Sequence, residues 1–145
     1  MQTRKWKLDT DYKYLVEWWK QYDFGTVPKE CLPPDGVVVL LDRPICAAGL
    51  YLCKGTKFGF MEWVVVDKKI GLKTAHNALN LCIEEIIQMA KNNNIKLLYT
   101  VTAQEALQKR YTKYHGMEIG EKSSMTFVKD LSNKKYKDLD FVKDA

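Results

Sequence analysis

The sequence predicts one small α/β domain built on a mixed, mostly antiparallel sheet that is flanked by helices. Its 145 residues suit a single core, and 46% of them are hydrophobic. Three strand-like runs follow one another between residues 37 and 67, which indicates an antiparallel meander. A long amphipathic helix and another strand come next. Because a strand reached through a helical crossover runs parallel to its predecessor, the last pair is expected to be parallel.

The first third of the chain predicts an edge strand, a helix and a loop. Thr3–Lys7 is the candidate edge strand, and Asp9 or Thr10 then offers a side-chain oxygen that can cap a helix. This helix is expected to end at Gly25, before a proline-containing loop over residues 26–35. Its apolar face repeats at helical spacing and consists of Tyr12, Leu15, Trp19 and Tyr22.

The meander consists of three consecutive runs of apolar residues separated by turns. Val37–Leu41 is a continuous β-branched and apolar run, which is typical of a buried strand. Ile45–Cys53 is expected to return beside it, with Gly49 as a candidate bulge. Phe58–Asp67 is the third strand of the antiparallel set.

The second half of the chain predicts a helix, a strand and another helix. The long helix stops at Asn92–Asn94, because Asn tolerates the left-handed conformation of a helix end. Lys96–Thr102 is the next strand, and Gln104–His115 is a second helix that Gly116 closes. The apolar face of the long helix repeats every three or four residues and consists of Ala75, Leu79, Cys82, Ile86 and Ala90.

The C-terminal part predicts the end of the domain and a tail. Met117–Ile119 and Ser123–Val128 have the composition of a closing hairpin, which makes residues 1–128 one domain. Residues 129–145 mix Lys and Asp and are expected to form a weakly structured tail that docks through Phe141.

Composition and charge exclude several classes of protein. The net charge of +5 is too small to indicate nucleic-acid binding by itself. No apolar run approaches the roughly 18 residues of a membrane span, and the charged N-terminus does not resemble a signal peptide. Only two histidines and no C-x-x-C pair are present, so no metal site is expected. Buried free thiols in a reducing cytoplasm explain the four cysteines, which are Cys31, Cys46, Cys53 and Cys82.

Three short segments carry a resemblance to a known family. They are Glu62–Asp67 before the long helix, the strand Lys96–Thr102, and the segment Tyr111–Met117 with its Tyr-x-x-Tyr-x-Gly pattern. Together with the order of elements, they resemble the GNAT superfamily of acyl-CoA-dependent N-acyltransferases, especially small members encoded by phages and prophages. The resemblance spans Thr3 to Val128. It implies that acetyl-CoA is the acyl donor. The acceptor would be a primary amine of a small molecule or a protein, and that amine would attack the acetyl group directly.

The resemblance also implies where acetyl-CoA binds. The pantetheine arm would lie along backbone groups where two strands splay apart, and the pyrophosphate would lie on the free N–H groups that begin the long helix. The family's glycine-rich loop is altered here, because Thr74 and His76 occupy two places of small residues. Nearby lysines add positive charge, although an ordinary solvated loop is the alternative. The implied set is Val64, Val66, Lys68, Lys69, Gly71, Lys73, Thr74, Ala75 and His76.

Glu62, Tyr111 and Tyr114 are the candidate catalytic residues. By strand alternation, Glu62 is expected on one face with Val64 and Val66, where it can take a proton from an amine. Members of the family often place the acid tyrosine four residues before the closing glycine, a position that is a threonine here, so either flanking tyrosine is the candidate acid. The alternatives are a solvated or ion-paired carboxylate and two tyrosines that only pack.

A second hypothesis is a catalytically inactive GNAT-like protein that binds a protein partner or, less readily, nucleic acid. The altered loop favours it. Trp18 and Trp19 are adjacent on the first helix and point in different directions, so one of them is expected near the surface. An exposed indole there would suit a protein interface or a lid over the acceptor, and a partly covered indole is the alternative.

Overall fold

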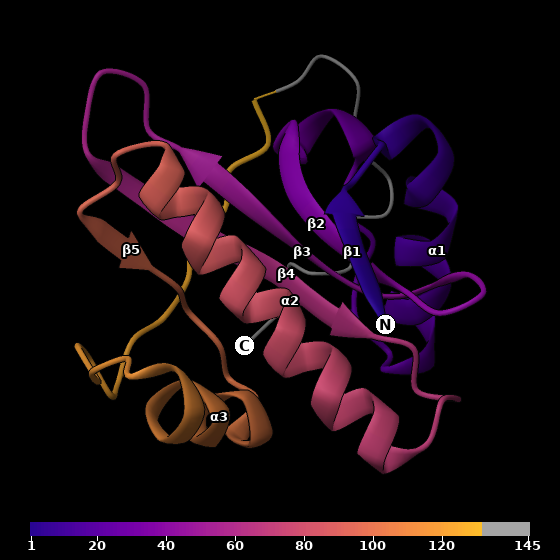
Figure 1. Ribbon diagram of the computed structural model, residues 1–145. Helices are drawn as coiled ribbons and strands as arrows, with labels where there is room; N and C mark the ends of the chain where they lie inside the picture. Colours follow the sequence, from indigo (N-terminus) through magenta and orange to yellow (C-terminus); the bar gives the residue numbers. More distant parts are fainter. Residues whose placement is uncertain (132–145) are drawn as a thin grey trace.

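The computed structural model describes residues 1–131 and shows a twisted sheet between helices (Figure 1). The helix α1 packs on one face, and α2 and α3 lie on the other. The elements in chain order are β1 (Gln2–Lys5), α1 (Leu8–Gln21), a 3-10 turn (Lys29–Cys31), β2 (Asp35–Leu40), β3 (Pro44–Leu52), β4 (Phe58–Val66), α2 (Leu72–Asn92), β5 (Leu97–Tyr99) and α3 (Glu105–His115).

The sheet is mixed, as the sequence predicts. Its strands lie in the order β1-β2-β3-β4-β5, and each neighbouring pair is antiparallel except β4 and β5, which are parallel. The parallel pairing runs only from Phe58 beside Leu97 to Phe60 beside Tyr99. The predicted strand over residues 96–102 is therefore too long, because the chain leaves the sheet after Tyr99. Beyond this point β4 continues without β5.

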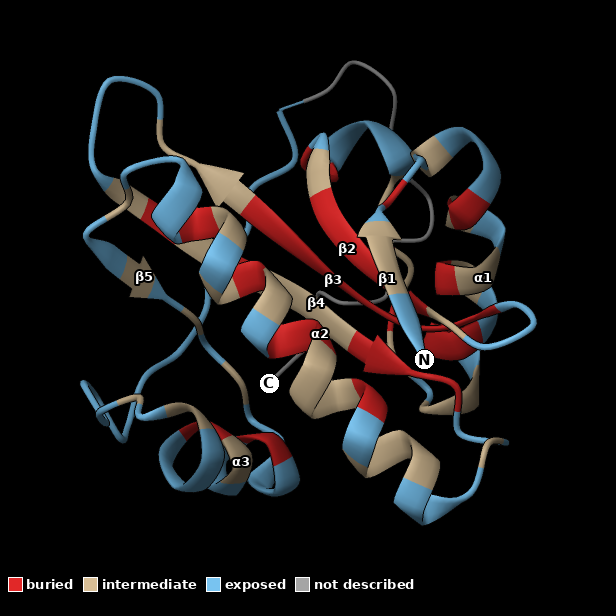
Figure 2. Cartoon of the chain, viewed as in Figure 1, coloured by how far each residue is buried: buried red, intermediate tan, exposed pale blue. Residues whose placement is uncertain are grey.

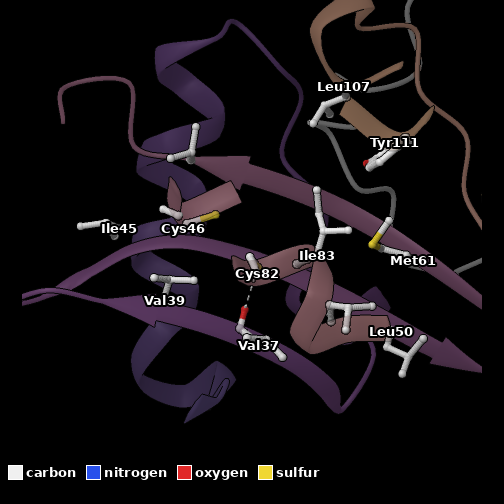
Figure 3. Packing of buried hydrophobic residues seen from close by; sticks show 14 of the residues in the cluster. Val37, Val39, Ile45, Cys46, Leu50, Met61, Cys82, Ile83, Leu107 and Tyr111 are labelled. Carbon is white, nitrogen blue, oxygen red and sulfur yellow. Dashed lines mark hydrogen bonds between the residues drawn. The ribbon is translucent and has the colours of Figure 1, made fainter. Parts of the chain in front are cut away.

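The core consists of two apolar clusters on opposite faces of the sheet. Alternation along β2 divides them, since Val37 and Val39 point toward α2 whereas Val38 points toward α1. Figure 3 shows the α2 side, where Ile83 and Leu50 are fully buried. Figure 2 shows that burial is greatest in the central strands and on the inner faces of the helices.

Trp18 and Trp19 are both buried, with 1% and 3% of their surfaces exposed, so the prediction of one exposed indole is wrong. Both belong to the cluster on the α1 side. Each is covered in part by an aromatic ring of its own helix. The ring centroids of Tyr14 and Trp18 are 6.0 Å apart, and those of Tyr12 and Trp19 are 6.3 Å apart. Neighbouring side chains can therefore both be buried when a helix has a wide aromatic face.

The ends of the first helix also differ from the prediction. Neither Asp9 nor Thr10 caps it. Lys7 is the N-cap residue, and its N–H donates to the Asp11 carboxylate at 2.7 Å. The helix ends at Gln21, four residues before Gly25. The predicted ends of the later helices are confirmed, because α2 ends at Asn92 and Gly116 closes α3 in the left-handed conformation with φ 63°.

The predicted hairpin after α3 is wrong. Residues 116–131 contain no strand. Met117 packs partly against the core, but the other large apolar side chains are exposed, among them Met125 and Phe127. The physical reason lies in β5, which is too short to offer an edge for a further pair of strands. The predicted docking residue Phe141 lies outside the described residues.

The predictions about membrane spans and about the cysteines can both be compared with residues 1–131. No helix within residues 1–131 is long and apolar enough to cross a membrane. All four cysteines are free, and Cys46 and Cys82 are buried as predicted. Cys31 is exposed because it belongs to the 3-10 turn on the surface, and Cys53 is only partly covered.

Candidate active site

A cavity of about 320 Å³ opens where β5 diverges from β4. One wall is formed by residues 62–64 of β4 and another by residues 100–104, which connect β5 to α3. Leu107 and Tyr111 of α3 close one side, and Trp19 of α1 closes another. The cavity exists because the parallel pairing ends at Tyr99, so the two strands no longer hold each other beyond that residue.

A β-bulge in β4 shapes the wall of this cavity. Glu62 pairs with Gly49 and Val65 pairs with Ala47, so β4 has one more residue than β3 between the two pairs. Trp63 lies in this extra stretch with φ 62°, a left-handed conformation that is uncommon for a large side chain. The sequence predicts a bulge at Gly49, but the extra residue belongs to the opposite strand.

The bulge changes which side chains share a face. Met61, Val64 and Val66 pack into the cluster on the α2 side, whereas Trp63 packs on the α1 side. Regular alternation would have put Met61 and Trp63 on the same face. The prediction that Glu62 shares a face with Val64 and Val66 is therefore wrong, because the inserted residue reverses the alternation between them.

Among the described residues, Glu62 is the one charged side chain that lines the cavity. Burial raises the pKa of this carboxyl to about 7, and a hydrogen bond from the Val101 N–H opposes the rise. That bond is long, 3.4 Å from the Val101 nitrogen to Oε1. A carboxyl with a pKa near 7 takes up and releases protons readily at neutral pH, which suits a general base.

The two candidate tyrosines lie in different surroundings. Tyr111 is buried and lines the cavity with Glu62. Burial raises the pKa of Tyr111, and the negative charge of Glu62 adds to the rise against a side-chain hydrogen bond with Thr100. Tyr114 is 47% exposed and lies outside the cavity wall, with its ring 5.3 Å from the ring of His76. The structure thus brings Tyr111, and not Tyr114, to Glu62.

The loop before α2 is fixed by Asp67, which is only 2% exposed. Its carboxylate accepts from the Lys69 N–H at 3.0 Å and from the Gln21 side chain at 3.0 Å. Arg43 pairs with the other oxygen at 2.8 Å. The Gln21 oxygen in turn accepts from the Lys68 N–H at 2.8 Å. The loop is therefore tied to α1 and to the turn between β2 and β3.

The start of α2 has the features of an anion site. Gly71 is the N-cap residue, its φ is 64°, and no side chain caps the free N–H groups of the first turn. No acidic residue lies in this turn, whereas Lys68, Lys69 and Lys73 are exposed around it. A helix N-terminus carries roughly half a positive charge, so its dipole and the lysines attract the same kind of ligand.

The remaining predicted loop residues divide into two groups. Thr74 and Ala75 lie half-buried in the first turn, beside the anion site. His76 instead faces α3, where a guanidinium nitrogen of Arg110 lies 3.2 Å from its Nδ1 and 3.3 Å from its carbonyl oxygen. The same nitrogen donates to Asn80 Oδ1 at 2.7 Å. His76 therefore belongs to the contact between the two helices.

Several residues that shape the site were missed at the level of sequence. Asp67 was placed only as the end of a strand, although a buried carboxylate beside a charged loop is a recognisable anchor. Arg110 has no sequence signal, because its partners lie about thirty residues away in α2. Within the described residues, no group of three or more His, Cys, Asp or Glu side chains is arranged to hold a metal ion.

Comparison with known proteins finds acetyltransferases of the same overall fold. No family model and no curated protein matches the sequence. The solved structure of Rv2747 from Mycobacterium tuberculosis, in complex with CoA, aligns with a TM-score of 0.66 at 15% identity over 87% of this chain and 76% of its own. An acetyltransferase from Trypanosoma brucei aligns with a TM-score of 0.62 at 13% identity over 88% and 99%. Glucosamine-6-phosphate N-acetyltransferase from Arabidopsis thaliana aligns with a TM-score of 0.59 at 15% identity over 90% and 98%.

Likeness at these identities establishes architecture. The mixed sheet, the parallel β4–β5 pair and the helices on both faces correspond to those acetyltransferases over most of the chain. The particular resemblance to phage-encoded proteins stays a prediction. The chain has the fold of the GNAT acetyltransferases.

Proposed function

We propose that this protein is an acetyl-CoA-dependent N-acetyltransferase that acts on a primary amine. The observation that carries the proposal is the cavity between β4 and β5, which Glu62 and Tyr111 both line. The next element of the chain is α2, whose N-terminus has no side-chain cap and is flanked by lysines. The presence of CoA in one structural neighbour supports the choice of donor.

The residues at the start of α2 fit the phosphate groups of CoA. The free N–H groups of the first turn would bind the pyrophosphate, and Lys68, Lys69 and Lys73 would supply charge. A methyl group built on Gly71 would meet no atom within 4 Å, so the approach is open there. Within residues 1–131, no strand pairs with the outer edge of β4 beyond Phe60, and backbone groups at Val64 and Val66 would bind the pantetheine arm there. When bound, acetyl-CoA supplies the activated acetyl group as a thioester.

The side chains of the cavity account for the proton transfers. Glu62 takes a proton from the ammonium group of the acceptor, directly or through water, and frees the nitrogen lone pair. The freed amine would then displace the thiolate of CoA from the acetyl group. Sulfur would take up one proton, and nitrogen would lose its second proton as the amide forms, which would return through water to the group that protonated the sulfur. Tyr111 is the proposed donor of the proton to sulfur, because it lines the same cavity as Glu62 and its hydroxyl is protonated at neutral pH. Tyr114 lies outside the cavity, which disfavours it for this role.

The second candidate function is a non-catalytic protein with this fold that binds a protein partner. One observation favours it, namely the exposed apolar side chains along β5 and after α3, which are Leu97, Tyr99, Val101, Ile119, Met125 and Phe127. A protein that uses only this surface needs neither the cavity nor the anion site.

Isothermal titration with acetyl-CoA and with CoA tests the proposal. Micromolar binding, about −8 kcal/mol, is expected for the wild type. A Lys68→Ala/Lys69→Ala/Lys73→Ala variant should bind at least tenfold more weakly. The matched control is a triple alanine variant of three exposed lysines away from the start of α2, which are Lys54, Lys57 and Lys96, and it should bind like the wild type. If millimolar acetyl-CoA or CoA produced neither heat nor a thermal shift, the acetyltransferase proposal would be rejected and the partner-binding function would remain.

A further inference from the structure

A polar cluster between α2 and α3 contains both histidines of the chain, His76 and His115. Figure 1 shows α3 beside α2, and two residues of α3, Arg110 and His115, reach across to Asn80 and Glu84 of α2. His115 is the last residue of α3, and 1% of its side chain is exposed. Its ring is buried between the helices, where its nitrogens need hydrogen-bond partners.

Arg110 fixes the orientation of the Asn80 amide. A guanidinium nitrogen of Arg110 lies 2.7 Å from Asn80 Oδ1. Because a guanidinium donates hydrogen bonds and never accepts them, the amide atom beside it must be the oxygen. The same oxygen lies 3.1 Å from Nε2 of His115. This ring nitrogen therefore has to donate, and it carries a proton.

The other nitrogen of the His115 ring carries a proton as well. Nδ1 lies 2.6 Å from Oε1 of Glu84, and a carboxylate accepts hydrogen bonds. A neutral imidazole donates from one nitrogen only, so a ring that donates to Glu84 and to Asn80 at once is an imidazolium. The last turn of a helix also favours a cation, because the helix dipole is negative there. Two independent contacts and the position in the helix thus indicate the charged ring.

The groups around this ring make its charge matter for the contact between the helices. In the described part of the chain, the charged or titratable side chains that contact His115 directly or through Asn80 are Glu84 and His76 of α2 and Arg110 of α3. Glu84 carries the opposite charge and Arg110 a like charge. Loss of the proton would end the attraction to Glu84 and leave one of the two hydrogen bonds without its donor. Histidine side chains ordinarily make this change between about pH 5 and pH 8.

We propose that His115 is a positioning residue whose imidazolium holds α3 against α2, and that this contact weakens as the pH rises and the ring loses its proton. Tyr111 lies one helical turn before His115 on the same face of α3, and it lines the cavity. Movement of α3 therefore moves the proposed acid. The consequence for catalysis rests on the proposed acetyl transfer, whereas the consequence for the contact between the helices does not.

Nuclear magnetic resonance of the two histidine rings tests the charge directly. Long-range proton–nitrogen spectra distinguish a ring that is protonated on both nitrogens from either neutral form, and His115→Gln assigns the signals. Wild-type His115 should be an imidazolium at pH 6 and neutral at pH 9. Glu84→Gln removes the opposite charge and should move the midpoint of this change at least about 0.5 pH unit lower. A ring that is neutral at pH 6, or a midpoint that Glu84→Gln leaves in place, would overturn the inference.

Thermal unfolding tests whether this charge holds α3. His115→Gln is compared with the wild type at each pH from 5.5 to 9, so the ionisation of Glu62 affects both proteins equally. The variant should unfold at least about 3 °C below the wild type at pH 6. The difference should shrink below about 1 °C at pH 9, because the wild type has then lost the contact too. Equal differences at every pH would show that His115 only packs.

The matched control for both experiments is Glu105→Gln. It removes an exposed carboxylate of α3 that pairs with Lys109 of the same helix. This variant should leave the midpoint of the His115 signals unchanged, and its thermal midpoint should differ from that of the wild type by the same amount at every pH. An effect as large as that of Glu84→Gln would show that any acidic residue near α3 acts on His115, which would contradict a specific pair.

Steady-state kinetics tests the link from His115 to Tyr111. Acetyl transfer is followed at saturating acetyl-CoA with the fastest of butylamine, spermidine and glucosamine as the acceptor. The ratio of wild-type kcat to His115→Gln kcat should be at least about fivefold at pH 6.5 and should fall toward one at pH 9. The KM for acetyl-CoA should stay within about twofold, because the start of α2 is untouched. A ratio that does not change with pH would overturn the positioning role.

Failure of this inference can be distinguished from failure of the proposed function. If acetyl-CoA neither binds nor reacts, the transferase is rejected, and the spectra and thermal midpoints still decide whether the charge of His115 holds α3. Acetyl transfer with a constant ratio of kcat values keeps the enzyme and rejects the positioning role. A neutral His115 together with acetyl transfer rejects the whole inference and leaves the proposed function intact.

Discussion

At the scale of single residues, Glu62 couples the proposed chemistry to the stability of the fold. Burial raises the pKa of its carboxyl from an ordinary value of 4.5 to about 7. Between these values the folded state holds a proton that the unfolded state has released, so the free energy of unfolding falls as the pH rises. Glu62→Gln removes this dependence. We expect the variant to gain about 1 to 3 kcal/mol relative to wild type between pH 4.5 and pH 8 in denaturant titrations. Stability curves that stay parallel would contradict this.

The same ionisation predicts the pH dependence of the reaction. Glu62 acts as a base only when it is ionised, so kcat/KM should rise with an apparent pKa of about 7. Glu62→Gln should lose at least a hundredfold in kcat/KM and keep its affinity for acetyl-CoA, because the lysines and α2 are untouched. Rates are measured from pH 5.5 to pH 9 at saturating acetyl-CoA. A variant with wild-type activity at pH 8 would show that another group is the base.

Asp67 holds the loop that leads into α2 in its conformation. Burial by itself would raise the pKa of this carboxyl, but the Lys69 N–H, Gln21 and Arg43 together lower it. Asp67→Ala leaves these partners without an acceptor, and we expect a loss of about 1 to 3 kcal/mol in the free energy of unfolding. Titration should also show weaker binding of acetyl-CoA. Asp42→Ala, an exposed change beside Arg43, is the control and should alter neither quantity.

Part of this site was predictable at the residue scale. Glu62 and Tyr111 were selected from short motifs, and both line the cavity. The face of Glu62 was predicted wrongly, because alternation assumes a regular strand and the bulge depends on how β3 and β4 pair. His76 was assigned to the loop by its position in a motif, but Arg110 of a later helix draws it to the other side. Contacts between distant segments have no local signature in the sequence.

At the scale of elements, α3 holds Tyr111 in place through its contact with α2. Arg110 donates to Asn80 and to the carbonyl of His76. Arg110→Ala should release α3, lower the free energy of unfolding by about 1 to 2 kcal/mol and reduce kcat more than it weakens acetyl-CoA binding. Lys109→Ala removes an exposed pair with Glu105 and is the matched control. Equal loss of kcat in both variants would show that the contact does not position Tyr111.

The order of the elements was more predictable than their lengths. Periodicity predicted the meander, the long helix and the parallel pair, because each of these is coded by a local run of side chains. The length of β5 and the absent hairpin were not predictable in this way. The run Lys96–Thr102 has a strand-like composition, but its last residues bend away to line the cavity. Whether an apolar run pairs in a sheet depends on what lies beside it, and that is a property of the whole fold.

At the scale of the whole molecule, the two clusters of the core share strands β2 to β4 and should unfold together. The four tryptophans report on one side, because Trp6, Trp18 and Trp19 belong to the α1-side cluster and Trp63 packs against it. The longest helix, α2, lies on the other side and dominates the helical circular dichroism signal. Tryptophan fluorescence and circular dichroism should therefore give coincident transitions in denaturant.

A substitution on the α2 side makes this prediction sharper. Ile83 is fully buried in the α2-side cluster, so Ile83→Ala should cost about 2 to 5 kcal/mol. The tryptophan transition should shift by the same free energy as the circular dichroism transition, although the tryptophans lie across the sheet. Asn77→Ala, an exposed change on the same helix, should shift neither transition by more than about 0.5 kcal/mol. If the fluorescence midpoint of Ile83→Ala stayed at the wild-type value, the two faces would be separate folding units. The strands that they share would then not transmit stability from α2 to α1.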